Sequence, residues 1–220
     1  MAVFLRGAET FLRGAETGSL QVETTYADIA WLVEEEELGD LWCLAFVRGL
    51  DEAEALRRMG AEEESIRPLT YETLMDEGLF EDMVLAGRLD DWTVLIEVYG
   101  WQATEPDVLR ALSAGTEVVS VLRHDFYAND FMYAVDGGLV TYFTYMHPAR
   151  RYGSDPDRLV AAMMEAGFDP EHRRDDQEDD NAHRPTIDGA LLLAARLTGV
   201  VLTQDVLSGP LMGGVVDSRP

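Results

Sequence analysis

Residues 131–144 read Phe-Met-Tyr-Ala-Val-Asp-Gly-Gly-Leu-Val-Thr-Tyr-Phe-Thr. The aromatic and β-branched residues on either side of Asp136-Gly137-Gly138 are typical of strands, and a short turn rich in Asp and Gly is typical of a β-hairpin. This stretch therefore predicts two adjacent antiparallel strands, 131–135 and 139–144.

A second, weaker hairpin signal precedes it. The apolar runs 83–89 and 92–99 flank Asp90-Asp91, a turn that has no glycine. Two further apolar runs, 41–47 and 117–123, predict single strands. The sequence thus indicates a sheet of about five or six strands.

Helices are predicted before, between and after these strands. Their expected ranges are 26–33, 51–59, 70–75, 105–114, 155–166 and 186–197, several of which begin at an Asp or Thr that can cap a helix. Because the strands come as adjacent hairpins, we expect the α+β class, an antiparallel sheet covered by helices. A parallel doubly wound sheet is the weaker alternative, since strict alternation of strand and helix fails.

The 220 residues are enough for one domain. Residues 1–24 are predicted to be an N-terminal extension, in which residues 4–10 are repeated without change at 11–17. Residues 25–220 are predicted to form a single α+β domain, with a polar, acidic loop at about 169–183 and a tail of short apolar pieces at 200–216.

The charge is strongly negative. Asp and Glu number 42 against 17 cations, a formal net charge of −25, and every cation is Arg because the chain has no Lys. This balance argues against direct nucleic-acid binding and against an anionic membrane surface, since both need basic residues. No secretory signal and no apolar stretch long enough for a membrane helix is found, so we expect a cytoplasmic protein.

Five segments carry a family resemblance. They are Trp92-Thr-Val-Leu-Ile-Glu97, Leu112-Ser-Ala-Gly-Thr-Glu-Val-Val-Ser120, Tyr133-Ala-Val-Asp-Gly137, Arg151-Tyr-Gly-Ser-Asp-Pro-Asp-Arg158 and Ala195-Arg-Leu-Thr-Gly199. They resemble family 6461 of the domains of unknown function, which is common in actinobacteria. The resemblance covers about residues 26–212 and implies a compact cytoplasmic domain from a GC-rich source, with no activity and no catalytic residue.

The motifs of common enzymes are missing from the sequence. It contains no Gly-x-Gly-x-x-Gly, no P-loop and no Gly-x-Ser-x-Gly, and its four histidines show no zinc-binding spacing. We therefore predict no catalytic residue, no metal site and no cofactor. Cys43, within an apolar run, is expected to be a buried, unreactive thiol.

Glu97 is the most informative polar residue, because it falls inside a predicted strand. An unpaired carboxylate there is costly, so either that face is open to water or an arginine such as Arg123 pairs with it. A pocket formed by Glu97 with Trp101, Arg123, His124 and His147 is the alternative hypothesis, in which Glu97 acts on a ligand.

Arg150 and Arg151 lie in a predicted loop and form a second candidate binding site. Adjacent arginines in a chain with few cations can accept an anionic group, or they can neutralise nearby acids such as Asp155 and Asp157.

These observations favour a non-enzymatic protein-interaction module, with a basic protein as its partner because the chain is so acidic. Two alternatives stay open. One is an enzyme or small-molecule-binding protein that uses the pocket around Glu97, and the other is an acidic mimic of a nucleic acid. The sequence does not indicate whether the chain forms a homo-oligomer.

Overall fold

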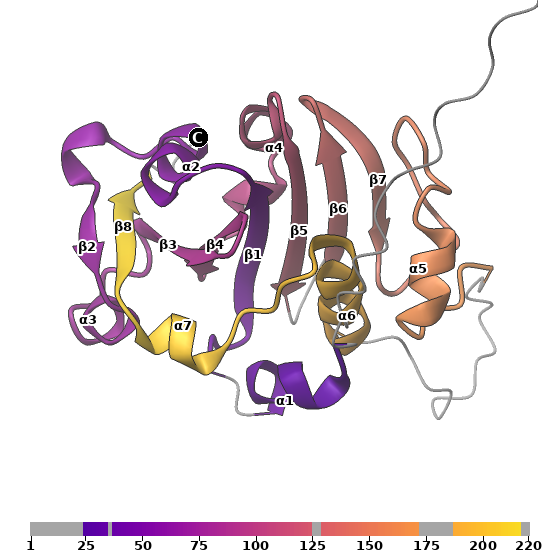
Figure 1. Cartoon of the computed structure of the whole chain (residues 1–220), viewed down its shortest axis with the longest axis horizontal. Helices are drawn as coiled ribbons and strands as arrows, with labels where there is room; N and C mark the ends of the chain where they lie inside the picture. Colours follow the sequence, from indigo (N-terminus) through magenta and orange to yellow (C-terminus); the bar gives the residue numbers. More distant parts are fainter. Residues whose placement is uncertain (1–23, 35–36, 125–128, 172–186, 217–220) are drawn as a thin grey trace, which may run out of the picture.

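The computed structural model describes residues 24–34, 37–124, 129–171 and 187–216. Within these residues one sheet of eight strands runs across the molecule in the order β2-β8-β3-β4-β1-β5-β6-β7 (Figure 1). Every neighbouring pair is antiparallel. The α+β class is therefore confirmed, and the parallel alternative is wrong.

The strands are β1 (Leu41–Arg48), β2 (Arg67–Leu69), β3 (Met83–Leu89), β4 (Trp92–Val98), β5 (Glu117–His124), β6 (Asp130–Val135), β7 (Gly138–Thr144) and β8 (Leu211–Val215). Both predicted hairpins are present, as β3-β4 and β6-β7. The expected number of strands, five or six, is wrong because β2 and β8 were not predicted.

Helices cover both faces of the sheet. One face packs against α1 (Tyr26–Glu34), α3 (Tyr71–Asp76), α5 (Val160–Glu165), α6 (Ile187–Thr198) and α7 (Gln204–Ser208). The other packs against α2 (Glu52–Met59), the short 3-10 helix η2 (Gln102–Thr104) and α4 (Pro106–Ser113); a second 3-10 helix, η1 (Glu63–Ser65), lies near β8. We call these the α6 face and the α4 face.

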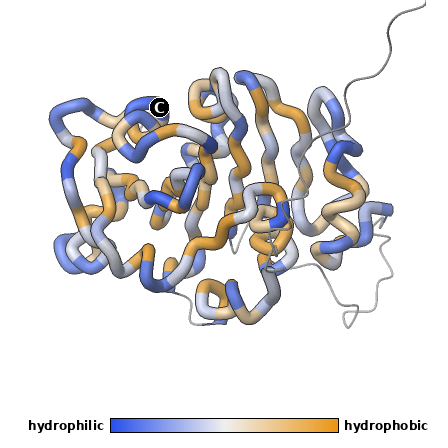
Figure 2. The backbone as a smooth tube through the Cα atoms, in the orientation of Figure 1, coloured by the Kyte–Doolittle hydropathy of each residue, from blue (hydrophilic) through white to orange (hydrophobic). Residues whose placement is uncertain are grey.

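The central strands are apolar on both sides because both faces are covered. In β1, Leu44 and Phe46 belong to the core of the α6 face, while Cys43 and Ala45 belong to that of the α4 face. Figure 2 shows hydrophobic residues running along the strands beneath the helices. Strands that are buried on both faces have continuous apolar sequences, whereas strands with one exposed face alternate apolar and polar residues.

The segment expected to be an apolar tail contains α7 and β8, so that prediction is wrong. Strand β8 lies between β2 and β3, and its glycines are the reason it fits there. A Cβ on Gly213 would lie 2.7 Å from the Leu69 side chain, and one on Gly214 would lie 2.9 Å from the Ala61 Cβ. Glycine is depleted in strands, which is why the sequence did not indicate one here.

Both edges of the sheet are protected. At one edge β2 is three residues long and contains Pro68, which has no N–H to offer to another strand. At the other edge, residues 152–155, which we call the edge segment, run beside β7 and exchange backbone hydrogen bonds between Tyr152 and Tyr142. Asp155 N donates to Val140 O there, which explains why the predicted helix at 155–166 begins only at Val160.

The predicted N-caps of α2 and α3 are present. The Asp51 side chain accepts from Glu54 N at 2.7 Å, and Thr70 Oγ1 accepts from Thr73 N at 3.1 Å. Each satisfies one of the N–H groups that a helix leaves open at its start.

Replacing Asp51 with Ala should lower the free energy of unfolding by about 1 kcal/mol, because the first turn of α2 loses this acceptor. Urea denaturation measures the loss. Asp51→Asn retains an acceptor and should stay within a few tenths of a kcal/mol of the original protein. Equal losses in the two variants would contradict the capping role.

Two further predictions concern residues that mostly lie outside the described part of the chain. The N-terminal extension with its repeated heptapeptide, and all but the first residues of the predicted acidic loop, lie outside the described residues. In the described part, none of the helices has the length and hydropathy needed to cross a membrane.

Candidate functional site

Glu97 lies near the end of β4, on the α4 face. It pairs across the sheet with Cys43 of β1, and only 2% of its surface is exposed. The neighbouring residues Ile96 and Val98 point into the core of the α6 face. The carboxylate is thus inside the protein rather than on a face open to water.

Backbone N–H groups satisfy this buried carboxylate. Gln102 N donates to Oε2 at 2.7 Å, and Ala103 N donates to Oε1 at 2.9 Å. These donors belong to η2, whose N-cap residue Trp101 supplies no side-chain acceptor. Glu97 therefore caps η2 from the neighbouring strand, and the prediction that water or an arginine such as Arg123 satisfies it is wrong.

The loop between β4 and η2 is fitted closely around this carboxylate. A Cβ on Gly100 would lie 2.8 Å from Glu97 Oε2, so any larger residue at position 100 would displace the carboxylate. On the far side of η2, Ser120 Oγ donates to Ala103 O at 3.1 Å. The loop is thereby tied to both β4 and β5.

Burial dominates the titration of this cluster. It raises the pKa of Glu97 from its ordinary value of 4.5 to about 7, although the hydrogen bonds from Ala103, Gln102 and the Cys43 thiol lower it. Burial, followed by the nearby Glu97 charge, raises the pKa of Cys43 well above its ordinary value. Cys43 is thus a buried neutral thiol, as the sequence predicts.

Two aromatic side chains project from the loop that Glu97 holds. Tyr99 is 52% exposed and Trp101 is 46% exposed. Tyr99 adopts a φ of 59°, uncommon for a bulky residue, and its ring packs against Phe80 at 5.3 Å between centroids. We call Tyr99-Gly100-Trp101 the aromatic loop.

Sequence reasoning identified Trp101 and missed Tyr99. The available signal was two large aromatic residues on either side of a glycine directly after a strand, because glycine often marks a place where the chain turns sharply.

The other residues of the hypothetical pocket lie at the same end of the sheet as Glu97. Arg123 pairs across the sheet with Trp42, on the α6 face, and its Nη2 lies 3.7 Å from Asp40 Oδ1. His124 ends β5, where its N–H donates to Asn129 Oδ1 at 2.9 Å. His147 lies in the turn after β7, and its N–H donates to Thr144 O. The structure thus places Arg123 on the opposite face from Glu97.

Arg150 and Arg151 differ in their surroundings. The Arg151 side chain is 9% exposed, lies 2.6 Å from Asp157 Oδ1, and donates to the carbonyl oxygens of Pro148 and Pro170. It neutralises Asp157 and ties two turns together, which is one of the two roles predicted for it. Arg150 is exposed.

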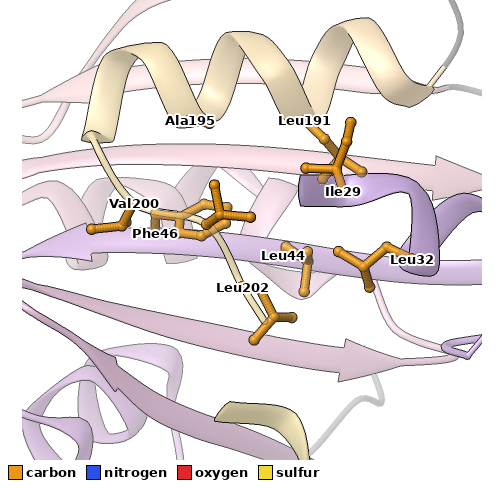
Figure 3. Close-up of a pocket in the computed structure, with 9 residues that line it drawn as sticks. Ile29, Leu32, Leu44, Phe46, Leu191, Ala195, Val200 and Leu202 are labelled. Atoms are coloured by element: carbon orange, nitrogen blue, oxygen red, sulfur yellow. The ribbon is translucent and has the colours of Figure 1, made fainter. Parts of the chain in front are cut away.

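An apolar cavity of about 10 Å³ lies on the α6 face, beneath α1 and α6 (Figure 3). Its lining residues are Ile29, Leu32, Leu44, Phe46, Leu191, Ala195, Val200, Val201 and Leu202. A space of this size holds at most one water molecule and offers it no polar side chain, so it is a small packing gap rather than a ligand site. Among the described residues, no group of three or more His, Cys, Asp or Glu side chains is placed to hold a metal ion.

Comparison with known proteins gives one match. No curated protein and no solved structure matches the chain. A protein-family model, described as a family of unknown function (DUF6461), matches residues 22–210, which include every described strand except β8. The chain therefore belongs to the DUF6461 family.

Proposed function

We propose that this protein is a non-enzymatic protein-interaction module of the cytoplasm, and that its aromatic loop contacts a basic protein partner. The observation that carries the proposal is the pair of exposed aromatic side chains, Tyr99 and Trp101, on a loop whose backbone is fixed by the buried Glu97 carboxylate.

Aromatic residues on a fixed loop suit binding. Trp and Tyr are the residues most enriched among those that dominate protein interfaces. A loop already held in one conformation also loses little conformational entropy when a partner binds. This loop is held by the hydrogen bonds of Glu97 and Ser120 to the backbone of η2, and by the close contact between Gly100 and Glu97.

Charge favours a basic partner. The chain carries a net charge of −25. Exposed Glu105 follows η2, the helix directly after the aromatic loop, and Tyr99 lies near Gly39, next to exposed Asp40. A partner with a basic surface would be attracted to this region, mainly through a faster rate of association.

Replacing Trp101 with Ala should weaken the complex by roughly thirtyfold, because an interface anchor of this kind contributes about 2 kcal/mol. The partner is first captured from a cytoplasmic extract at low and moderate salt, then purified, and its Kd is measured by calorimetry against the full chain and its variants. Tyr99→Ala should also weaken binding. Tyr26→Ala removes a Tyr that is 41% exposed on α1 and is the matched control, which should leave the Kd unchanged.

Three outcomes would overturn the proposal: no specific partner at either salt concentration, an acidic partner, or a partner that binds the Trp101→Ala variant as tightly as the original protein. A captured DNA-binding protein that duplex DNA displaces would instead support the nucleic-acid mimic.

A further inference from the structure

A second site lies at the corner of the sheet formed by β6, β7 and the edge segment. The Tyr142 hydroxyl of β7 donates to Asp130 Oδ1 of β6 at 3.2 Å. The Tyr142 ring stacks on that of Tyr152 in the edge segment, with 6.0 Å between centroids and 30° between planes. A carboxylate and two tyrosine rings thus form one continuous cluster.

Asp130 is buried without a cation. It is 8% exposed, and within the described part of the chain its carboxylate has a hydrogen bond from Tyr142 but no ion pair. Burial raises the pKa of Asp130, while the Tyr142 hydrogen bond lowers it. A buried carboxylate that lacks a positive partner is costly, and a cation supplied from outside would relieve that cost.

Two other titratable groups near Asp130, Tyr145 and Cys43, are neutral. The Tyr145 hydroxyl donates to the backbone oxygens of Leu122 and Asp130. Burial keeps Tyr145 and the nearby Cys43 in their protonated forms, because it raises the pKa of both. Neither of these two groups supplies a positive charge to Asp130.

The tyrosines make the corner suitable for a flat cation. Tyr152 is 57% exposed, so one side of the stack is open to solvent. A guanidinium is planar, stacks on aromatic rings and forms paired hydrogen bonds with a carboxylate, whereas an ammonium is a compact, strongly hydrated charge. These properties together favour arginine over lysine.

We propose that Asp130, Tyr142 and Tyr152 form a binding site for a guanidinium group, which stacks on the tyrosines and pairs with the carboxylate. The guanidinium comes either from an arginine side chain of a protein partner or from a free guanidino compound. The site is separate from the aromatic loop. Guanidinium binding here does not depend on whether the aromatic loop contacts a basic partner.

The test uses the full chain and two probes, N-acetylarginine amide and a short peptide of Gly and Ser with one central Arg. Binding is followed by NMR of the tyrosine ring signals. We expect Tyr152→Ala to weaken binding about fivefold and Asp130→Asn about tenfold. The matching lysine derivative should bind at least about threefold more weakly than the arginine derivative. Tighter binding of the peptide than of the amide indicates a protein source, and equal binding indicates a free compound.

A matched control exists on α1, where exposed Tyr26 donates to Glu34 at 2.9 Å. Glu34→Gln should leave binding unchanged. Because Asp130 is buried and its replacement can disturb folding, the exposed Tyr152 provides the decisive variant. Unchanged affinity in Tyr152→Ala, equal affinity for the arginine and lysine derivatives, or an equal loss in Glu34→Gln would overturn the proposal.

Discussion

Replacing Gly153 with Ala is expected to lower the free energy of unfolding by about 4 kcal/mol, a large effect for one added methyl group. Gly153 has a φ of 123°, and a Cβ there would lie 2.2 Å from Val140 O and 2.6 Å from Val140 C. Both atoms belong to the backbone of β7, so no side chain can move to make room. The edge segment would have to separate from β7, and its hydrogen bonds would be lost.

Gly78→Ala is the matched control. Gly78 also has a positive φ, of 68°, but nothing lies within 4 Å of its missing Cβ, so only backbone strain of about 1 kcal/mol is expected. Urea denaturation measures both variants, and light scattering detects association through the uncovered β7 edge. Similar losses in the two variants would show that the close contact with Val140 does not matter.

The second large effect is a pH dependence of stability that Glu97→Gln removes. The folded protein holds the pKa of Glu97 at about 7, against an ordinary value of 4.5, so between these values the folded state binds more protons than the unfolded state. The stability that protonated Glu97 provides is complete below about pH 4.5 and is lost as the pH rises through about 7. Above that range the contribution is constant.

We therefore expect the free energy of unfolding of the original protein to fall relative to Glu97→Gln by about 2 kcal/mol between pH 5.5 and pH 8. Gln is neutral at every pH, as protonated Glu is, so the difference between the two proteins isolates this carboxyl from the many others. Glu105→Gln, at an exposed position nearby, should show no such change. A difference between the original protein and Glu97→Gln that stays constant with pH would show that the carboxylate is ionised throughout.

Local signals account for the parts of the fold that the sequence predicted. The β6-β7 hairpin follows from Asp136 and Gly137, both of which adopt positive φ in the turn, and the start of α2 follows from Asp51. Strand β8 has no such local signal. Its glycines are acceptable only because Leu69 and Ala61, distant in the chain, fill the space beside them.

The candidate site also combines features that have a local sequence signal with features that have none. Glu97 and Trp101 were identifiable, because a carboxylate inside a strand and an aromatic residue in a loop both stand out by residue type. The groups that satisfy Glu97 are the backbone N–H groups of Gln102 and Ala103, which every residue except proline possesses. No pattern of residue types reveals such a partner, so the sequence suggested Arg123 instead.

The position of β8 has a consequence for how the protein is made. Strand β2 pairs only with β8 within the described sheet, and β3 has β8 on one side, so neither is complete until residues 211–215 have left the ribosome. During synthesis the growing chain therefore carries β3 with one row of backbone groups unpaired, the condition in which strands of different chains join. The strong negative charge keeps neighbouring nascent chains apart during that interval. A chain that stops before residue 211 would retain the open strand permanently and become a substrate for chaperones and proteases.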